Sequence, residues 1–283
     1  MVETIGLSIE SVLQQTCDDW ELIIVDDCSS DGTWELLQQK YTSHAKISLH
    51  RNDQNLKQWG NLNRCLELAT GHWLGFLPAD DTYRLHALET IKREVENRDD
   101  AILWMHAHLC HGDGIVPNIV PVYNRVTEFT SDELAELLYL KGNIFGELSS
   151  FFCKTNPTRI NTIRFRNSKA EDIDFWIRYL RMYNGSKAMY WPDVLAQVLQ
   201  HDQSASSNII KSRENLSRVL VQIGELGELG WPLSIVIKQY LRALIFLIRR
   251  WPKIPGNRME LFLDNVSKLK ITRKSRESHA ADL

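Results

Sequence analysis

Two pairs of neighbouring carboxylates follow apolar runs of the sequence and could bind a cation or a polar ligand. Asp26 and Asp27 end one aliphatic run, and Asp80 and Asp81 follow another. Carboxylates at the end of a buried strand are costly unless a cation or hydrogen-bond donors meet them. Hard divalent cations such as Mg²⁺ and Mn²⁺ take carboxylate, water and phosphate oxygens as ligands. The second pair therefore predicts a metal–diphosphate site. Alternatively, Asp80 caps a helix that begins near Tyr83, which would explain one carboxylate but not two.

The stretch between these pairs offers a second group of polar side chains. Asp27 could accept a hydrogen bond from a nucleotide base or ribose, as acidic residues at strand ends do in dinucleotide-binding folds. It could equally cap the helix that follows. In the loop 52–57, Lys57 could offer a positive charge to phosphate, although a solvated loop lysine is an equal alternative.

A third acidic pair, Glu171 and Asp172, opens a predicted helix. Carboxylates in a first turn complement the helix dipole and contribute about 0.3–1 kcal/mol each. One of the two could instead serve as a general base, and the sequence leaves both interpretations open.

Histidine appears in two contexts. His201 lies in a polar loop, where an imidazole is more plausibly a ligand or hydrogen-bonding group than a core residue, with a surface histidine as the alternative. In contrast, His106, His108 and Cys110 alternate along a predicted strand that leads to His111. Because no zinc-type spacing is completed elsewhere, we interpret them as ordinary strand and hairpin residues.

The elements that must position these residues alternate between helix and strand. Such alternation predicts a doubly wound α/β fold, in which ligands bind beyond the carboxyl ends of parallel strands. A hairpin in the second half makes the expected sheet mixed. Helices are predicted over 5–13, 34–41, 60–69, 85–97, 132–139 and 170–183, and strands over 21–27, 46–50, 72–77 and, as the hairpin, 101–122.

Composition excludes several classes of protein. The 283 residues suffice for one large or two small domains. With 33 Lys and Arg against 36 Asp and Glu, the net charge is −3, so no global positive field attracts nucleic acid. The five cysteines form no C-x-x-C pair, and residues 1–10 lack the features of a signal peptide. We therefore expect a reducing, cytoplasmic location and no nucleic-acid partner.

Taken together and in this order, five segments resemble family 2 glycosyltransferases of the GT-A fold. The similarity covers about residues 5–207, and each segment alone would be a weak signal. The segments are Ser11–Thr16, Glu21–Asp27, Ser29–Thr33, Asp80-Asp81 and Glu171–Arg178.

This resemblance implies an α/β, Rossmann-like GT-A fold with a mixed sheet. It also implies inverting transfer from a nucleotide-diphosphate-sugar donor, with a divalent cation (Mg²⁺ or Mn²⁺), to a saccharide or lipid-linked acceptor. The expected setting is the synthesis of a surface polysaccharide or glycan. By matching position, Asp172 is the expected catalytic base; Asp27, Asn55, Lys57 and Asp80 are expected to bind the donor; and Asp81 and His201 are expected to bind the metal.

The chain departs from the family pattern in several places. Pro78 stands where the family often has an Asp, Leu199 replaces an arginine of the closing R-x-H-x-x-S-x-S pattern, and Lys57 replaces a common glycine. In addition, the family opens with a central strand, whereas this chain opens with a helix. We therefore expect a sheet that lacks this strand and leaves backbone groups of its neighbours unpaired. The alternative function is a truncated, catalytically impaired module that binds a partner or a membrane.

The composition changes after residue 207. We expect a GT-A domain over 1–207 and a helical region with a basic tail over 208–283. Residues 235–253 are too short and too charged to span a bilayer, which takes about 20 mainly apolar residues. They could form an interfacial helix that contacts a membrane peripherally, or a helix that packs on the catalytic domain.

Overall fold

The computed structural model describes residues 2–112, 115–120, 122–155, 163–166, 172–200, 230–239 and 241. The chain divides into two compact units. One comprises Met1–Asn167 and Glu171–Ser212, and the other comprises Ser168–Ala170 and Arg213–Leu283. The fold presented here is that of the first unit.

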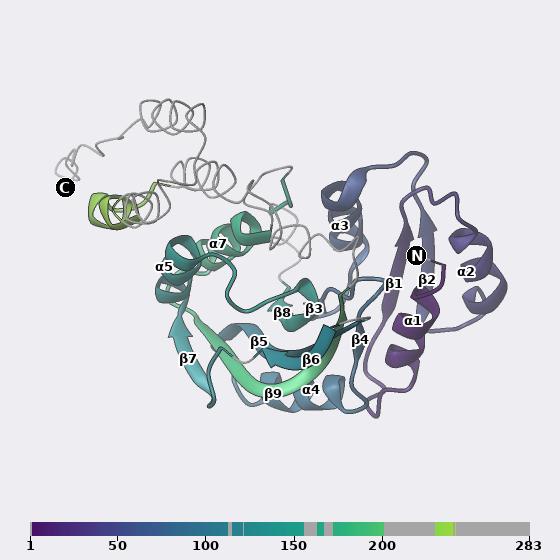
Figure 1. The fold of residues 1–283 in the computed structure, drawn as a ribbon, viewed down its shortest axis with the longest axis horizontal. Coiled ribbons are helices and arrows are strands. Elements are labelled where there is room, and N and C mark those ends of the chain that lie inside the picture. Colours follow the sequence, from purple (N-terminus) through teal and green to yellow (C-terminus); the bar gives the residue numbers. More distant parts are fainter. Residues whose placement is uncertain are drawn as a thin grey trace, which may run out of the picture. The chain divides into compact units, whose positions relative to one another are not determined.

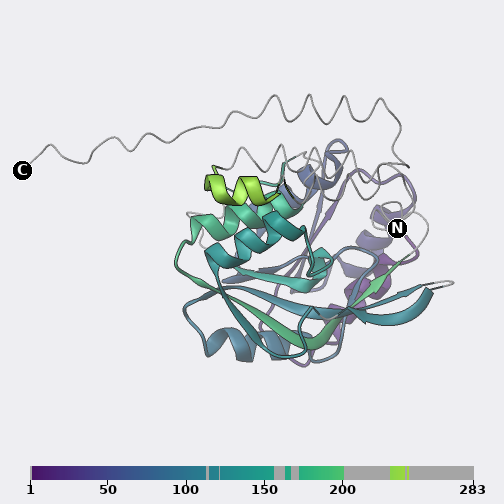
Figure 2. The same cartoon turned by 60° about the vertical axis from the view of Figure 1, so that its left-hand side comes forward.

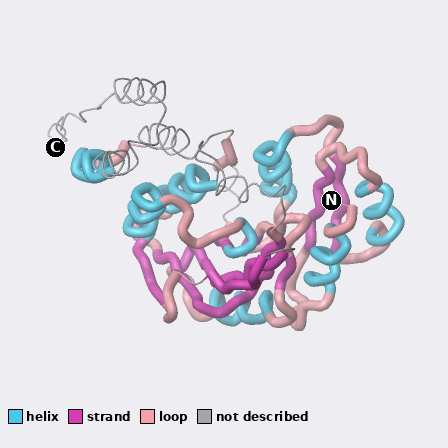
Figure 3. Tube along the Cα trace, in the orientation of Figure 1, coloured by secondary structure: helices cyan, strands magenta, loops and turns pink. Residues whose placement is uncertain are grey.

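The N-terminal part of this unit is a small parallel sheet with its helices. A two-stranded sheet forms from β1 and β2, whose register runs from Leu22 opposite Ile47 to Asp26 opposite Arg51. Figure 3 shows this pair standing apart from the other strands. Helices α1 and α2 share an apolar cluster with the pair, which includes Ile9 and Leu37. The elements are α1 (Ile5–Leu13), β1 (Leu22–Asp26), α2 (Thr33–Tyr41), β2 (Ile47–Arg51) and α3 (Lys57–Leu68).

The rest of the unit is built on a mixed sheet of seven described strands, in the order β3-β8-β5-β9-β4, with β6 paired to β5 and β7 paired to β9. Only β5 and β9 pair in parallel in this sheet. The predicted mixed α/β sheet is confirmed, but most of its pairs are antiparallel. Its elements are β3 (Trp73–Gly75), β4 (Thr82–Tyr83), α4 (Ala87–Glu96), β5 (Ala101–Gly112), β6 (Ile115–Val120), β7 (Thr127–Thr130), α5 (Ser131–Lys141), the 3-10 helix η1 (Leu148–Ser150), β8 (Phe151–Lys154), α7 (Asp172–Met182) and β9 (Lys187–Leu199).

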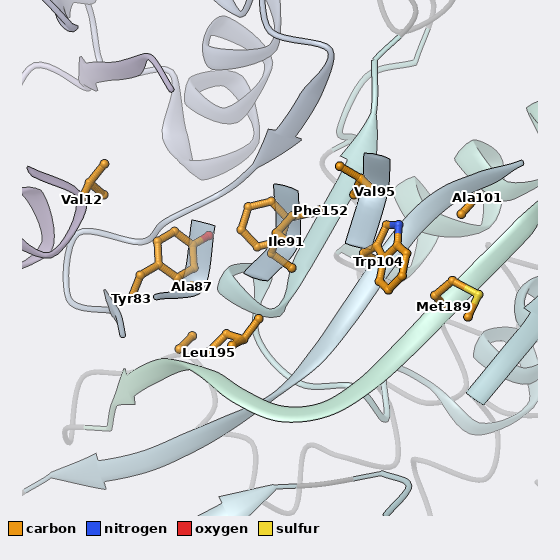
Figure 4. Packing of buried hydrophobic residues seen from close by; sticks show 11 residues of the cluster. Val12, Tyr83, Ala87, Ile91, Val95, Ala101, Trp104, Phe152, Met189 and Leu195 are labelled. Carbon is orange, nitrogen blue, oxygen red and sulfur yellow. The ribbon is translucent and has the colours of Figure 1, made fainter. Parts of the chain in front are cut away.

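Helices cover both faces of this sheet. Helix α4 lies on one face, and α5 and α7 lie together on the other (Figures 1 and 2). On the α4 face, Ile91 and Val95 belong to the same apolar cluster as Trp104, Phe152 and Met189 of the strands (Figure 4). Burial of this apolar surface is the main favourable term that fixes the sheet under the site.

The two sheets present edges that no described strand joins. In β1, Leu22 N–H donates to Lys46 O (2.9 Å) and Asp26 O accepts from Asn52 N–H (2.9 Å). The backbone N–H and C=O groups of Ile23 and Val25 therefore point away from β2. On that open side, Val25 O accepts from the Asn61 side chain of α3 at 3.0 Å. This agrees with the expected absence of a strand next to β1.

The edge of β3 is open in the same way. Thr155 N–H donates to His72 O at 2.7 Å, so in this antiparallel pair Trp73 and Gly75 turn their backbone groups away from β8. The start of β3 is tied to the start of β1 by Glu21, whose Oε1 accepts hydrogen bonds from the backbone N–H groups of Thr70 (2.8 Å) and Gly71 (2.9 Å). A side chain thus bridges the two sheets where backbone bonding does not.

None of the helices in the described ranges is long and apolar enough to cross a bilayer. The described part of the second unit includes a helical segment at 233–239.

Candidate functional site

Asp81 is a buried carboxylate, 2% exposed, at the turn that precedes β4. The turn closes through a hydrogen bond from Asp81 N–H to Pro78 O at 3.1 Å. The Ser149 hydroxyl donates to Asp81 Oδ2 at 2.7 Å, and Leu199 N–H donates to Oδ1 at 3.3 Å. Because a strand and not a helix begins at Thr82, the alternative in which Asp80 caps a helix near Tyr83 is wrong.

The surroundings of Asp81 leave its negative charge poorly compensated. Burial, with smaller contributions from the nearby carboxylates of Asp80 and Glu147, raises the pKa of Asp81 from 3.8 to about 7, against the hydrogen bonds from Ser149 and Leu199. No cation in the described part of the chain is among the causes of this shift. A positive ion bound here would therefore strongly stabilise the ionised form of the Asp81 carboxylate.

His201, the other predicted metal ligand, lies outside the described residues. The chain that leads to it is placed, since Leu199 hydrogen-bonds Asp81 and Gln200 N–H donates to His111 O at 2.7 Å. The segment thus passes Asp81 two residues before His201.

Asp172 is the first residue of α7 and is partly buried. The Asn143 side chain donates from Nδ2 to Asp172 Oδ2 at 2.6 Å. Burial, with a smaller contribution from the Glu147 carboxylate, raises the pKa of Asp172 to about 7, although hydrogen bonds from Asn143 and backbone N–H groups oppose this rise. A carboxylate whose pKa lies near neutrality is suited to general base catalysis. Its position in the first turn also complements the helix dipole, and its role as a general base stays a prediction, while Glu171 lies outside the described residues.

One short loop links these two carboxylates. Asn143, which contacts Asp172, and Ser149, which contacts Asp81, both belong to the segment that leads from α5 into η1. Glu147, between them in the chain, raises the pKa of both aspartates. The sequence analysis missed Asn143, Ser149 and Glu147. The only signal was a pair of glycines, Gly142 and Gly146, after a predicted helix, which is also typical of an ordinary loop.

The donor-side residues form a second cluster around the end of β1. Asp27 Oδ1 accepts from the Asn52 side chain (2.9 Å) and from Leu56 N–H (2.7 Å) and so holds the loop 52–57 against the strand. Asp27 does not cap α2, whose N-cap is Gly32 and has no side-chain cap. The interpretation of Asp27 as a helix cap is therefore wrong, and its carboxylate orders the loop that carries Lys57.

Asn55 and Lys57 are exposed and adjacent to this anchor. Asn55 Oδ1 accepts from Lys57 N–H at 3.0 Å, and Lys57 adopts a φ of 64° as the first residue of α3. The helix thus begins three residues before the predicted start at 60, and Lys57 is held at a helix N-terminus, where anions bind favourably.

Asp26 has a structural role. Its Oδ2 pairs with Arg51 Nε at 3.2 Å and accepts from Ser29 N–H at 3.1 Å, and the carboxylate is buried. Asp26 therefore links β1 to β2, whereas Asp27 bonds the loop 52–57.

The histidines of β5 are strand residues, as predicted. His106 and His108 are buried; His106 Nδ1 hydrogen-bonds Ala107 O at 2.8 Å, and His108 Nδ1 hydrogen-bonds the Ser150 hydroxyl at 3.1 Å. Burial lowers the pKa of His106 to about 4, so the ring is neutral. Among the described residues no cluster of three or more His, Cys, Asp or Glu side chains could hold a metal ion.

The sequence and the fold both have known relatives. The model of Glycosyl transferase family 2 matches residues 2–119. The Bacillus subtilis protein TuaG, whose name places it in teichuronic acid biosynthesis as a glycosyltransferase, is 28% identical over 219 residues, which cover 77% of this chain and 82% of TuaG. A PGL/p-HBAD biosynthesis glycosyltransferase of Mycobacterium bovis is 28% identical over 257 residues, which cover 89% of this chain and 87% of that protein.

Among solved structures, the chain is similar to S. aureus TarS residues 1–349 in complex with UDP-GlcNAc. The TM-score is 0.67 at 15% identity, and the match covers 93% of this chain and 76% of TarS 1–349. It is also similar to the mannosyltransferase PcManGT of Pyrobaculum calidifontis in complex with GDP-Man and Mn²⁺, with a TM-score of 0.57 at 12% identity, over 94% of this chain and 76% of that one. These likenesses show a GT-A fold.

Proposed function

We propose that this chain, whose residues 2–119 match the model of glycosyl transferase family 2, transfers a sugar, with inversion, from a nucleotide-diphosphate-sugar donor to an acceptor hydroxyl. The observation that carries this proposal is the pair of carboxyl groups, Asp81 and Asp172, that one short loop holds and whose pKa values lie near 7. One is suited to bind a cation and the other to accept a proton.

In the proposed reaction, Asp172 takes the proton from the acceptor hydroxyl as its oxygen attacks the anomeric carbon of the donor. The new glycosidic C–O bond forms as the bond from the anomeric carbon to the diphosphate oxygen breaks, and the nucleoside diphosphate leaves from the opposite face. A single displacement of this kind inverts the anomeric centre. A pKa of about 7 lets Asp172 be ionised near neutral pH and still bind the proton that it removes.

We propose that the Asp81 carboxylate supplies an oxygen ligand to a divalent cation. Carboxylate oxygens are the ligands that Mg²⁺ and Mn²⁺ prefer, and the nearby charges of Asp80 and Glu147 are also negative. We assign Asp81 and His201 to the cation and Asp80 to the donor ribose. When bound, the cation supplies electrostatic stabilisation of the charge on the leaving diphosphate. The complex of PcManGT with GDP-Man and Mn²⁺ supports this assignment by analogy of fold.

We assign the nucleotide to the end of β1. Asp27 would contact the base, and Asn55 and Lys57 would face the donor from the loop that Asp27 anchors. The free ammonium of Lys57 offers charge to phosphate without the fixed geometry that an arginine would impose.

The acceptor we propose is a saccharide or a lipid-linked saccharide of a surface polysaccharide or glycan. TuaG and the mycobacterial relative, named for teichuronic acid and PGL/p-HBAD biosynthesis, support this class. A cytoplasmic location is proposed from the cysteines, all five of which are free.

Peripheral membrane contact through residues 235–253 also stays a proposal. Leu233, just before this region, is 53% exposed, and Ile237 and Leu241 in its described part are 49% and 53% exposed. Residues four apart lie on the same face of a helix, so these side chains form one exposed apolar stripe.

Calorimetric titration of the full chain with UDP-, GDP- and dTDP-sugars, with and without Mn²⁺, tests the donor assignment. We expect one of these donors to bind in a Mn²⁺-dependent way, and we expect Asp81→Asn to weaken that binding at least tenfold. Asp99→Asn, an exposed carboxylate away from the site, is the matched control and should bind as the wild type does. If none of the three donors bound, the proposal would fail in favour of a non-catalytic binding or membrane-associated module.

A further inference from the structure

The Asn143 side chain both donates and accepts hydrogen bonds beside Asp172, the proposed base. Its Nδ2 donates to Asp172 Oδ2 at 2.6 Å and to Gly146 O at 2.7 Å, and its Oδ1 accepts from Phe145 N–H at 3.2 Å. Two donated bonds and one accepted bond fix the orientation of the amide plane. The carboxylate of Asp172 therefore meets a donor that cannot rotate away.

The loop that carries Asn143 is itself rigidly seated. It leaves α5 at Gly142, with a φ of 81°, and turns again at Gly146, with a φ of 100°. A Cβ at Gly146 would lie 2.0 Å from Cε1 of His108, so the backbone rests directly on this buried ring. Between the glycines, Phe145 is fully buried beside Tyr190 of β9, at 5.7 Å between ring centroids. Asn143 is thus fixed to the sheet as well as to α7.

We propose that Asn143 is a positioning residue for Asp172: its amide sets the direction of the carboxylate and keeps the ionised form of the base populated. This inference rests on the proposed function, in which Asp172 accepts the acceptor proton. Asn143 itself contacts neither of the reacting oxygens in this role and acts through Asp172.

The charges around Asp172 explain why such a donor is needed. Burial and the Glu147 carboxylate of the same loop both favour the neutral acid, and the hydrogen bond from Asn143 opposes them. The arginines of α7 are engaged elsewhere, since Arg178 pairs with Asp174 at 2.6 Å and Arg181 faces Asp132 of α5. In the described surroundings the Asn143 amide and the first backbone N–H groups of α7 are what stabilise the charged base.

The direct test is the titration of Asp172 in the full chain, followed by ¹³C NMR of labelled aspartate carboxyl groups. Asp172→Asn, which removes one resonance, assigns the signal. We expect the midpoint to rise by about one pH unit in Asn143→Ala and by more in Asn143→Asp, which is isosteric but adds a charge and cannot donate when ionised. Asn97→Ala, whose side chain bonds only a helix carbonyl, is the control and should leave the midpoint unchanged.

A second arm measures turnover of the donor found by calorimetry. We expect Asn143→Ala to lower kcat about tenfold at pH 7, to move the acidic limb of the pH profile upward, and to leave the donor Kd unchanged, with partial recovery at pH 8.5. An Asp172 midpoint that stays at the wild-type value in Asn143→Ala, even with a lower melting temperature, would overturn the inference. If the wild type turned over no donor, the proposed function would fail, while the titration would still decide the role of Asn143.

Discussion

The Ser149 hydroxyl donates to the Asp81 carboxylate at 2.7 Å, and both side chains are buried. Six residues earlier in the same segment, Asn143 donates to Asp172. The carboxylate assigned to the cation and the carboxylate assigned to proton removal are therefore supported by one loop. Because this loop bonds both carboxylates directly, its conformation helps to set the position of Asp81 relative to Asp172.

Asp172→Asn should lower the rate of sugar transfer by about 10²–10⁴-fold, the usual contribution of a positioned general base. The amide keeps the shape of the side chain but cannot take a proton, so the donor Kd should stay within about twofold. Asp132→Asn, in the first turn of α5, is the matched control for the dipole effect and should keep full activity. Equal transfer by the wild type and Asp172→Asn would refute the assignment of the base.

Asp81→Asn should make stability less dependent on pH. The folded protein keeps the Asp81 proton up to about pH 7, whereas the unfolded chain loses it near pH 4. The folded state binds the extra proton in this window, so the free energy of unfolding falls as pH rises, by up to about 4 kcal/mol. An asparagine can still bond Ser149 and Leu199, because a hydroxyl both donates and accepts.

Thermal unfolding followed by circular dichroism in EDTA at pH 5 and pH 8 measures this effect. The melting temperature of Asp81→Asn should exceed that of the wild type by several degrees more at pH 8 than at pH 5. Asp193→Asn, an exposed carboxylate, should show the same difference from the wild type at both pH values. If the difference between Asp81→Asn and the wild type were also equal at both pH values, the wild-type Asp81 carboxyl group would be ionised throughout the range from pH 5 to pH 8.

Gly146→Ala should cost at least about 3 kcal/mol of unfolding free energy. Its Cβ would overlap the His108 ring at 2.0 Å, and its φ of 100° disfavours any side chain. Gly185→Ala separates the two causes, since Gly185 has a φ of 82° but nothing within 4 Å of its Cβ. The control should lose only about 1 kcal/mol in urea denaturation, and a similar loss in both variants would disprove the contact with His108.

Ile237→Asp should reduce flotation of the full chain with vesicles of phosphatidylglycerol and phosphatidylcholine at least twofold. A charge in the middle of the exposed stripe opposes burial of its apolar side chains in the interface. Leu7→Asp in α1, where the wild-type leucine is 67% exposed, is the control and should float as the wild type does. No flotation of the wild type, or equal flotation of all three, would exclude this stripe as a membrane contact.

Local patterns account for the elements that sequence analysis predicted. The apolar stripe of α1 and the aliphatic run of β1 each identify an element without knowledge of its neighbours, and both occur where predicted. Four strands, β4, β7, β8 and β9, were not predicted. Long β9 contains Pro192 and Asp193, which interrupt a strand pattern, and its parallel pairing with β5 joins residues far apart in the chain.

The site was predictable only in part. Asp81 and Asp172 follow or begin regular elements, so their positions can be inferred from the ends of those elements. Asn143 and Ser149 act through contacts made when an irregular loop folds back onto α7 and β4. Nothing in the residue types of such a loop specifies that return, because its path is set by the packing of Phe145 and His108 beneath it.

The open edges of β1 and β3 separate the first unit into two parts that we expect to unfold at different denaturant concentrations. Within the described residues no backbone hydrogen bond joins a strand of one sheet to a strand of the other, and the link consists of the packing of α1 together with side-chain bonds such as those of Glu21 to Gly71 and of Gln15 to Arg84. In amide hydrogen exchange, Ile23 and Val25 should exchange faster than Leu22 and Ile24, whose N–H groups bond β2. The part that we assign to the nucleotide is then the first to open under mild denaturant, while the part that carries Asp172 stays folded.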